Sequence, residues 1–208
     1  YNERFVPQDP IVPAPTGIEE EGGVSKYTWK VQSNSDGTMN VNDRRIHMIW
    51  WEAMRKGAFS PVDPTRSVCV SKGEIREFLE GVLKKQGVAQ GELNAFANYW
   101  HELLKREEAP YFLVQPVSPS EQGKYLPEMR VDGEKAALFS LNRFYFRFEP
   151  VFDAACGMRP EAYLNRVDQR ELGANAVIDL GGEVAGQLNA EIDLAFNDAF
   201  IRKYIYAN

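Results

Sequence analysis

The sequence predicts an α+β fold, in which a two-helix hairpin packs on an antiparallel β-sheet and an extended arm precedes them. Apolar residues recur at helical spacing in two neighbouring segments between residues 71 and 107. Aromatic and polar residues alternate before residue 148, and the first 25 residues are rich in proline. The predicted organisation is an arm at residues 1–25 and a single α+β domain at residues 26–208.

The N-terminal arm differs in composition from the rest of the chain. Residues 1–25 hold four prolines and five acidic residues but one basic residue. Prolines at this spacing favour an extended chain. The arm could dock on its own domain or on a neighbouring copy through its apolar residues, which are Phe5, Val6, Ile11, Val12 and Ile18. The chain begins at Tyr1 and not at methionine, which is consistent either with a processed protein whose leader was removed for export or with a sequence trimmed at this end.

A β-hairpin is expected at the start of the domain. Residues 26–33 alternate apolar and polar side chains, which predicts a strand. Asp36 and Gly37 then form a dipeptide typical of hairpin turns, since both residues tolerate positive φ. The return strand is expected to run into residues 45–52, which are apolar on both faces and therefore predict a central strand.

Two helices are expected next, as a hairpin over residues 71–107. A β-like run at residues 67–70 leads to Ser71, and Glu74 stands three residues later, as in a capping box. The first helix follows and ends at Gly87. A second apolar stripe covers residues 90–107, and Pro110 stops it. The short link between the two segments predicts antiparallel neighbours.

The second half of the chain reads mainly as strands. Residues 111–117 predict a strand and residues 118–135 a polar loop. Residues 138–148 then place phenylalanines on one face and Arg143, Tyr145 and Arg147 on the other. Residues 149–173 read as loop, with a short helix after Pro160. A β-rich C-terminal part is expected at residues 174–206.

A short sequence echo lies within this C-terminal part. The pattern N-A-x-I-D-L occurs at residues 175–180 and again at residues 189–194. Two adjacent strands would explain the spacing, and a helix over residues 188–200 is the alternative.

Two surfaces are candidates for interaction. The cationic face formed by Arg143, Tyr145 and Arg147 could bind an anionic glycan, an acidic protein partner or the acidic arm of another copy, or could simply be solvated. The chain ends in an apolar segment that a monomer must cover, with Phe200, Tyr204 and Tyr206 as its aromatic residues.

Charge argues against a nucleic-acid partner, and hydropathy argues against a transmembrane segment. A formal net charge of −6 argues against a surface that grips phosphate backbones, so no nucleic-acid partner is expected. No apolar run approaches the roughly 18 residues of a spanning helix, so no transmembrane segment is expected.

The candidate catalytic patterns each lack a required member. His101 and Glu102 begin like a zinc-binding helix, but position 105 is Lys where a second imidazole is needed. His47 lies in an apolar strand, and no G-x-S-x-G elbow is present. We therefore expect no catalytic residue, no cofactor and no metal site.

Two acidic patterns leave weaker alternatives. Residues 34–43 are rich in Asn and Asp and loosely resemble a calcium loop, but Gln32 and Asp43 stand where Asp and a bidentate Glu belong. A hairpin turn is favoured there. Asp179 and Asp193, equivalent in the echo, could form a carboxylate pair or be two solvent-facing residues.

The chain has two cysteines, Cys69 and Cys156. They could close one long disulfide in an oxidising compartment or stay as two buried thiols in a reducing one. Their wide spacing leaves both possibilities open.

Residues of about 49–148 resemble a family of uncharacterised domains in bacterial cell-surface and envelope proteins. The resemblance lies in Trp50-Trp51-Glu52, the capped helix ending at Leu83, Gly87, residues 92–96, Tyr99-Trp100 and residues 110–114. Where members often have Leu-Pro after the tryptophan, this chain has His101-Glu102. The resemblance implies a secreted or cell-envelope location and no known activity.

Together these observations favour a non-catalytic structural or assembly subunit of a secreted or cell-envelope complex. We expect it to contact copies of itself or other subunits through the arm and the C-terminal segment. A binding module for an anionic glycan or acidic protein is the alternative, and an enzyme of unknown class is third.

Overall fold

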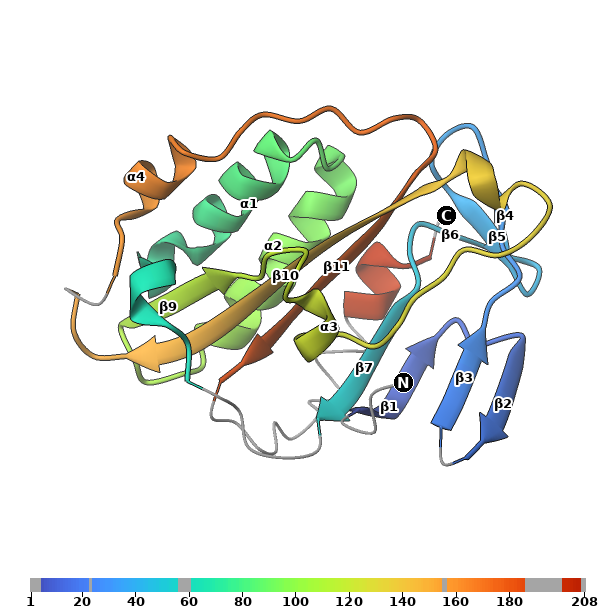
Figure 1. The fold of residues 1–208 in the computed structure, drawn as a ribbon, viewed down its shortest axis with the longest axis horizontal. Helices are drawn as coiled ribbons and strands as arrows, with labels where there is room; N and C mark the ends of the chain where they lie inside the picture. Colours follow the sequence, from blue (N-terminus) through green and yellow to red (C-terminus); the bar gives the residue numbers. More distant parts are fainter. Residues whose placement is uncertain (1–4, 23, 56–60, 155–156, 186–199, 207–208) are drawn as a thin grey trace. The chain divides into compact units, whose positions relative to one another are not determined.

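The computed structural model describes residues 5–22, 24–55, 61–154, 157–185 and 200–206 (Figure 1). The fold is mixed α+β, with several antiparallel sheets and few helices, which confirms the predicted class. The chain divides into two compact units. The first comprises Tyr1–Ala58 and Leu188–Asn208, and the second comprises Phe59–Gln187. The boundary expected at residue 25 from composition stays a prediction.

The described part of the first unit is built from three small antiparallel sheets. One pairs β1 with β7, the second pairs β2 with β3, and the third has the order β4-β5-β6. The strands are β1 (Phe5–Val12), β2 (Gly17–Glu21), β3 (Val24–Thr28), β4 (Gln32–Ser33), β5 (Met39–Val41), β6 (Arg44–Ile46) and β7 (Trp50–Arg55). The proline-rich N-terminal segment thus contains two strands.

The predicted turn at Asp36 and Gly37 is present. It joins β4 to β5, and Gly37 has a φ of 83°, which glycine adopts without strain. The predicted central strand over residues 45–52 is wrong. Asn42 and Asp43 have φ values of 50° and 60° and turn the chain from β5 into β6, which ends at residue 46. The His47 amide then donates to the Ile205 carbonyl, so that β7 starts separately and pairs with β1.

The core of the first unit combines residues of β5 and β6 with residues near the C-terminus. Val41 and Ile46 are buried together with Ile201 and Ile205. The last two come from a segment that is helical at residues 200–204. The apolar C-terminal end is therefore part of this unit's own core.

The second unit contains a four-stranded sheet of order β11-β10-β9-β8. Its strands are β8 (Val68–Ser71), β9 (Tyr111–Pro116), β10 (Ser140–Val151) and β11 (Ala176–Val184). The pairs β8–β9 and β9–β10 are antiparallel, whereas β10 and β11 are parallel. A parallel pair requires a crossover connection, and the short helix α4 (Pro160–Leu164) lies in the chain between β10 and β11. The first copy of the sequence echo lies in β11, and the second copy, residues 189–194, lies outside the described residues.

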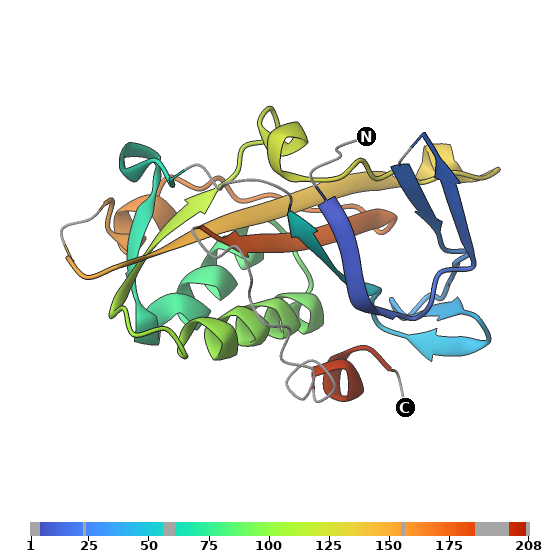
Figure 2. The same cartoon turned by 90° about the horizontal axis from the view of Figure 1, so that it is seen from below.

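Two main helices, α1 (Ile75–Lys85) and α2 (Gln90–Leu104), lie on one face of this sheet (Figure 2). The shorter helices are α3 (Gln122–Tyr125) and α4 (Pro160–Leu164), with 3₁₀ turns at η1 (Pro64–Arg66), η2 (Lys72–Glu74) and η3 (Ala136–Leu138). On α1 the buried residues are those at helical spacing, namely Ile75, Phe78, Leu79, Val82 and Leu83.

The start of α1 differs from a capping box. The Ser71 hydroxyl donates to the Glu74 carboxylate at 2.5 Å, and the 3₁₀ turn η2 stands between this serine and α1. Gly87 ends the α1 segment with a φ of 79°. A Cβ at this position would lie 2.8 Å from the Arg170 carbonyl oxygen, so backbone conformation and space both require glycine here.

Aromatic side chains join α2 to the sheet. Trp100 stacks on Phe148 with ring centroids 4.6 Å apart, and Phe96 lies 5.8 Å from Phe146. Phe146 and Phe148 are 1% and 0% exposed. The phenylalanine face of β10 is therefore the core face, and the alternate residues of the strand point to the other side.

Candidate functional site

The predicted cationic face holds a row of paired charges. Arg143 lies directly opposite Asp179 in the β10–β11 register, and its Nε donates to Asp179 Oδ2 at 2.7 Å. Arg147 lies opposite Glu183, and its Nε donates to Glu183 Oε1 at the same distance. The Tyr145 hydroxyl donates to the other Glu183 oxygen at 3.3 Å. Both arginines are thus neutralised within their own unit.

Little of this row reaches solvent. The Arg147 and Glu183 side chains are 2% and 8% exposed, and those of Arg143 and Asp179 are 14% and 12% exposed. The segment around α3 contributes to this burial, because Val117 and Leu126 form a buried cluster with Tyr145. A ligand for this face would have to displace that segment and break a buried ion pair.

The acidic members of the row were not identified from the sequence. The sequence echo suggests Asp193 as the partner of Asp179, but Asp193 lies outside the described residues, and no sequence motif marks Glu183. A usable signal exists, because Arg143 and Arg147 are four residues apart and so are Asp179 and Glu183. Equal spacing on two strands is what a parallel register of opposite charges requires.

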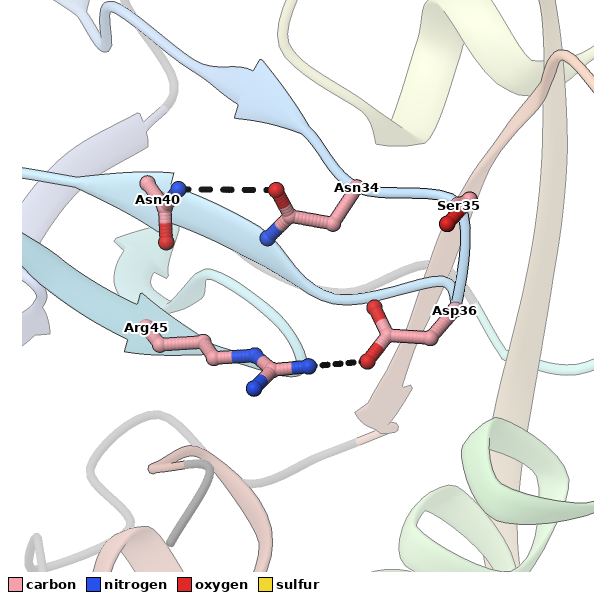
Figure 3. A pocket seen from close by; sticks show the side chains of 5 residues that line it. All are labelled: Asn34, Ser35, Asp36, Asn40 and Arg45. Carbon is pink, nitrogen blue, oxygen red and sulfur yellow. Dashed lines mark hydrogen bonds and ion pairs between the residues drawn. The ribbon is translucent and has the colours of Figure 1, made fainter.

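The turn between β4 and β5 borders a shallow hollow of about 340 Å³ (Figure 3). Its lining is polar and consists of Asn34, Ser35, Asp36, Asn40 and Arg45. Asp36 Oδ1 accepts from the Thr38 hydroxyl at 2.6 Å and from the Thr38 amide at 3.1 Å, and Asp36 Oδ2 pairs with Arg45. The Thr38 hydroxyl first, then its amide and the Arg45 guanidinium, hold the pKa of Asp36 below its usual range.

The polar side chains around this hollow stabilise the turn through hydrogen bonds to one another. Asn34 Nδ2 donates to the Thr38 hydroxyl at 3.0 Å, and Arg45 Nε donates to the same oxygen at 3.0 Å. The positively charged Arg45 guanidinium pairs with Asp36 Oδ2, whereas a calcium ion is held by oxygen ligands. Within the described ranges, no three His, Cys, Asp or Glu side chains gather at a metal-binding spacing.

The N-terminal segment is divided between a buried and an exposed part. In β1, Val12 packs against the core of the first unit, and Ile11 is partly buried. Phe5 and Val6 pair with β7 through the backbone, and their side chains lie outside those described. In β2, by contrast, Ile18 is 57% exposed.

Strand β2 has one bonded edge. It pairs with β3, and no other described strand pairs with it. Its residues Glu19, Glu20 and Glu21 are exposed, and Lys26 of β3 pairs with Glu19 at 3.1 Å. Among the residues of this segment whose exposure the structure describes (11–22 and 25), those of β2 include the exposed Ile18, Glu19, Glu20 and Glu21.

The aromatic residues predicted at the C-terminal end pack within the first unit. Phe200 is 6% exposed and lies 4.8 Å from the Trp50 ring and 4.9 Å from Tyr204. The Tyr206 hydroxyl accepts from Arg44 at 3.3 Å, and that guanidinium also lies 5.6 Å from the Tyr206 ring centre. The apolar C-terminal segment is therefore packed, through these contacts, against other residues of its own unit.

The two histidines belong to different units. His47 is exposed and follows β6 in the first unit, while His101 lies in the last turn of α2 in the second. His101 Nδ1 is buried, and no hydrogen-bond acceptor or donor for it is found among the described residues.

Cys69, on β8, is disulfide-bonded. The other cysteine of the sequence, Cys156, lies outside the described residues. The Cys69 sulfur is 3.3 Å from the carbonyl oxygen of Ala154, two residues before Cys156 in the chain.

Reduction of this disulfide is expected to destabilise the second unit by about 2–4 kcal/mol, because a long loop is released in the unfolded state. Thermal melting with and without a phosphine reductant measures the change. Cys69→Ser is the control, since its melting temperature should be low and independent of the reductant. A wild-type melting curve that the reductant leaves unchanged would contradict the expectation.

No described helix is both long enough and apolar enough to cross a membrane. Comparison with protein families, with curated proteins and with solved structures finds no match to this chain.

Proposed function

We propose that this chain is a non-catalytic structural subunit of a secreted or cell-envelope complex and that it contacts neighbouring copies through its N-terminal segment. The observation that supports this most is strand β2, which lies in that segment and pairs on one edge only among the described strands. The N–H and C=O groups along an open strand edge are a template for a further strand. Strand addition is a common way for protein chains to join.

The side chains of β2 support a restricted kind of contact. Ile18 adds exposed apolar surface to the open edge. The three glutamates that follow it resist unselective pairing, since charged side chains on an edge strand oppose aggregation. An apolar residue beside a charged run fits an edge that accepts a partner in a limited set of registers.

The proposal depends on the N-terminal segment alone. Phe200, Tyr204 and Tyr206 were expected to contact neighbours, but they take part in packing within their own unit. The disulfide-bonded state of Cys69 supports an oxidising compartment, in agreement with a secreted or envelope location.

Light scattering of the native protein, at increasing concentration, tests the proposal. We expect a particle heavier than the 23.6 kDa chain for the wild type and a single chain for Ile18→Asp, because a fourth carboxylate then stands on the strand edge. Val31→Asp is the matched control. Val31 is 48% exposed in the same unit but lies outside β2, so its substitution should leave the particle intact.

A single-chain mass for the wild type at every concentration would refute the proposal, as would an Ile18→Asp particle of unchanged mass. Deletion of the whole segment is a poorer test. It would remove β1, which pairs with β7, and so damage the unit itself.

A further inference from the structure

We infer that β2 pairs antiparallel with β2 of a second copy, about a two-fold axis that passes through Ile18. The inference rests on the proposed function and adds the partner strand and its register. The two hairpins then form one sheet of order β3-β2-β2-β3. Two strands alone are marginal in water, and a sheet of four is a more stable unit.

Symmetry reduces the possible registers to a short series. Two identical strands related by a two-fold axis face each other with the same patch on both copies, and the pairing is antiparallel. The register is then fixed by the residue at the axis. Shifting the axis by one residue along β2 moves every opposed pair by two residues.

Charge separates these registers. With the axis at Glu20, Glu20 would face its own copy and Glu19 would face Glu21. With the axis at Glu19, that residue would face its own copy. Like charges directly opposite each other destabilise a strand pair.

With the axis at Ile18, no carboxylate faces another carboxylate. Glu19 lies opposite Gly17, and Glu20 lies opposite Thr16. Glu19 is in addition paired with Lys26 of its own hairpin, which lowers the charge nearest to the axis. An axis at Gly17 also avoids opposed carboxylates. It places Pro15 nearer the centre of the strand pairing, however, and proline has no N–H to donate.

Burial favours the same register. Opposed residues on paired strands point to the same face, so Ile18 of each copy meets the other across the axis. The side chain that is 57% exposed in one chain is covered by its equivalent. An apolar cross-strand pair stabilises a sheet, and the glutamates remain in water on both sides of it.

Cysteine cross-linking tests the register. We expect Ile18→Cys to form a disulfide-linked dimer under mild oxidation, because position 18 faces itself. Glu20→Cys should not link to itself, since its two copies are about 13 Å apart along the strands at about 3.3 Å per residue. Mixing Gly17→Cys with Glu19→Cys should give a mixed dimer that neither variant gives alone.

Opposed residues in an antiparallel pair alternate between hydrogen-bonded and non-hydrogen-bonded positions. The Ile18 pair and the Gly17–Glu19 pair fall into different classes, so one of the two tests uses the class in which the side chains lie closer together. Gly17 has room for the change, because an added Cβ would lie 3.9 Å from Thr28 Cβ. The wild-type chain, oxidised in parallel, controls for its own two cysteines.

The outcomes separate the inference from the proposed function. Self-linking of Glu20→Cys, or a multi-chain particle in which Ile18→Cys and the mixture both fail to link, overturns the register and leaves the assembly standing. A single-chain mass together with no cross-links overturns both.

Discussion

Replacing Glu183 by glutamine is expected to destabilise the second unit by about 3–5 kcal/mol, because it removes the carboxylate that is ion-paired with a buried arginine, Arg147. Arg147 is 1% exposed, and its Nε donates to Glu183 Oε1. Glutamine retains the shape and one acceptor oxygen, so the variant removes the charge together with one of the two acceptors that Arg147 Nε and the Tyr145 hydroxyl use. Urea unfolding followed by circular dichroism measures the loss.

Two further variants make this test specific. Glu80→Gln removes a surface partner of Arg76, whose side chain is 50% exposed, and should cost less than about 0.5 kcal/mol. The double variant Arg147→Met with Glu183→Leu should recover most of the stability, because removing both charges also removes the cost of burying them. A Glu183→Gln loss as small as that of Glu80→Gln would contradict the role assigned to the pair.

The row of charges also specifies how β11 lies against β10. Both arginines of β10 face an acid on β11, at positions 143 with 179 and 147 with 183. A slip of one residue would turn every side chain of β11 to the other face and leave both arginines unpaired in a site with little solvent. We therefore regard these residues as determinants of strand register and not as a ligand site.

Local patterns predicted local structure well. The spacing of apolar residues on α1 matches its buried face, and Asp36-Gly37 marks a real hairpin turn. These signals lie within a few residues of one another. The turn at Asn42 and Asp43 is not predicted, because apolar residues on both faces of residues 45–52 favour one continuous strand and outweigh the left-handed residues just before it.

Contacts between distant residues account for the rest. Arg147 and Glu183 are 36 residues apart in the sequence, and Phe200 packs against Trp50, which lies far earlier in the chain. Sequence alone does not locate the partners of the cationic and apolar residues, so their pattern predicts surface features. The candidate contact strand β2 was recognised as part of an interacting segment, but its open edge and its exposed isoleucine required the strand pairing.

Replacing Trp100 by alanine is expected to cost about 3–5 kcal/mol, the range for truncating a buried aromatic side chain. Trp100 is 6% exposed and stacks on Phe148, and it also touches the Phe96 ring on its own helix. Urea unfolding read by circular dichroism is the suitable measurement, since the variant removes a fluorophore. Phe152→Ala is the control, because a 74% exposed phenylalanine should contribute less than about 0.5 kcal/mol.

Gly182 on β11 provides an independent test of the same packing. A Cβ at this position would lie 2.5 Å from Trp100 Cζ2 and 3.1 Å from the Phe146 carbonyl oxygen, so the indole lies directly against the strand. In the wild type, Gly182→Ala should cost about 1–3 kcal/mol through overpacking. In the Trp100→Ala background the nearest obstruction is gone, and the same substitution should cost clearly less. Equal costs in the two backgrounds would mean that Trp100 does not occupy this position against β11, and the large loss expected for Trp100→Ala would then lack its structural cause.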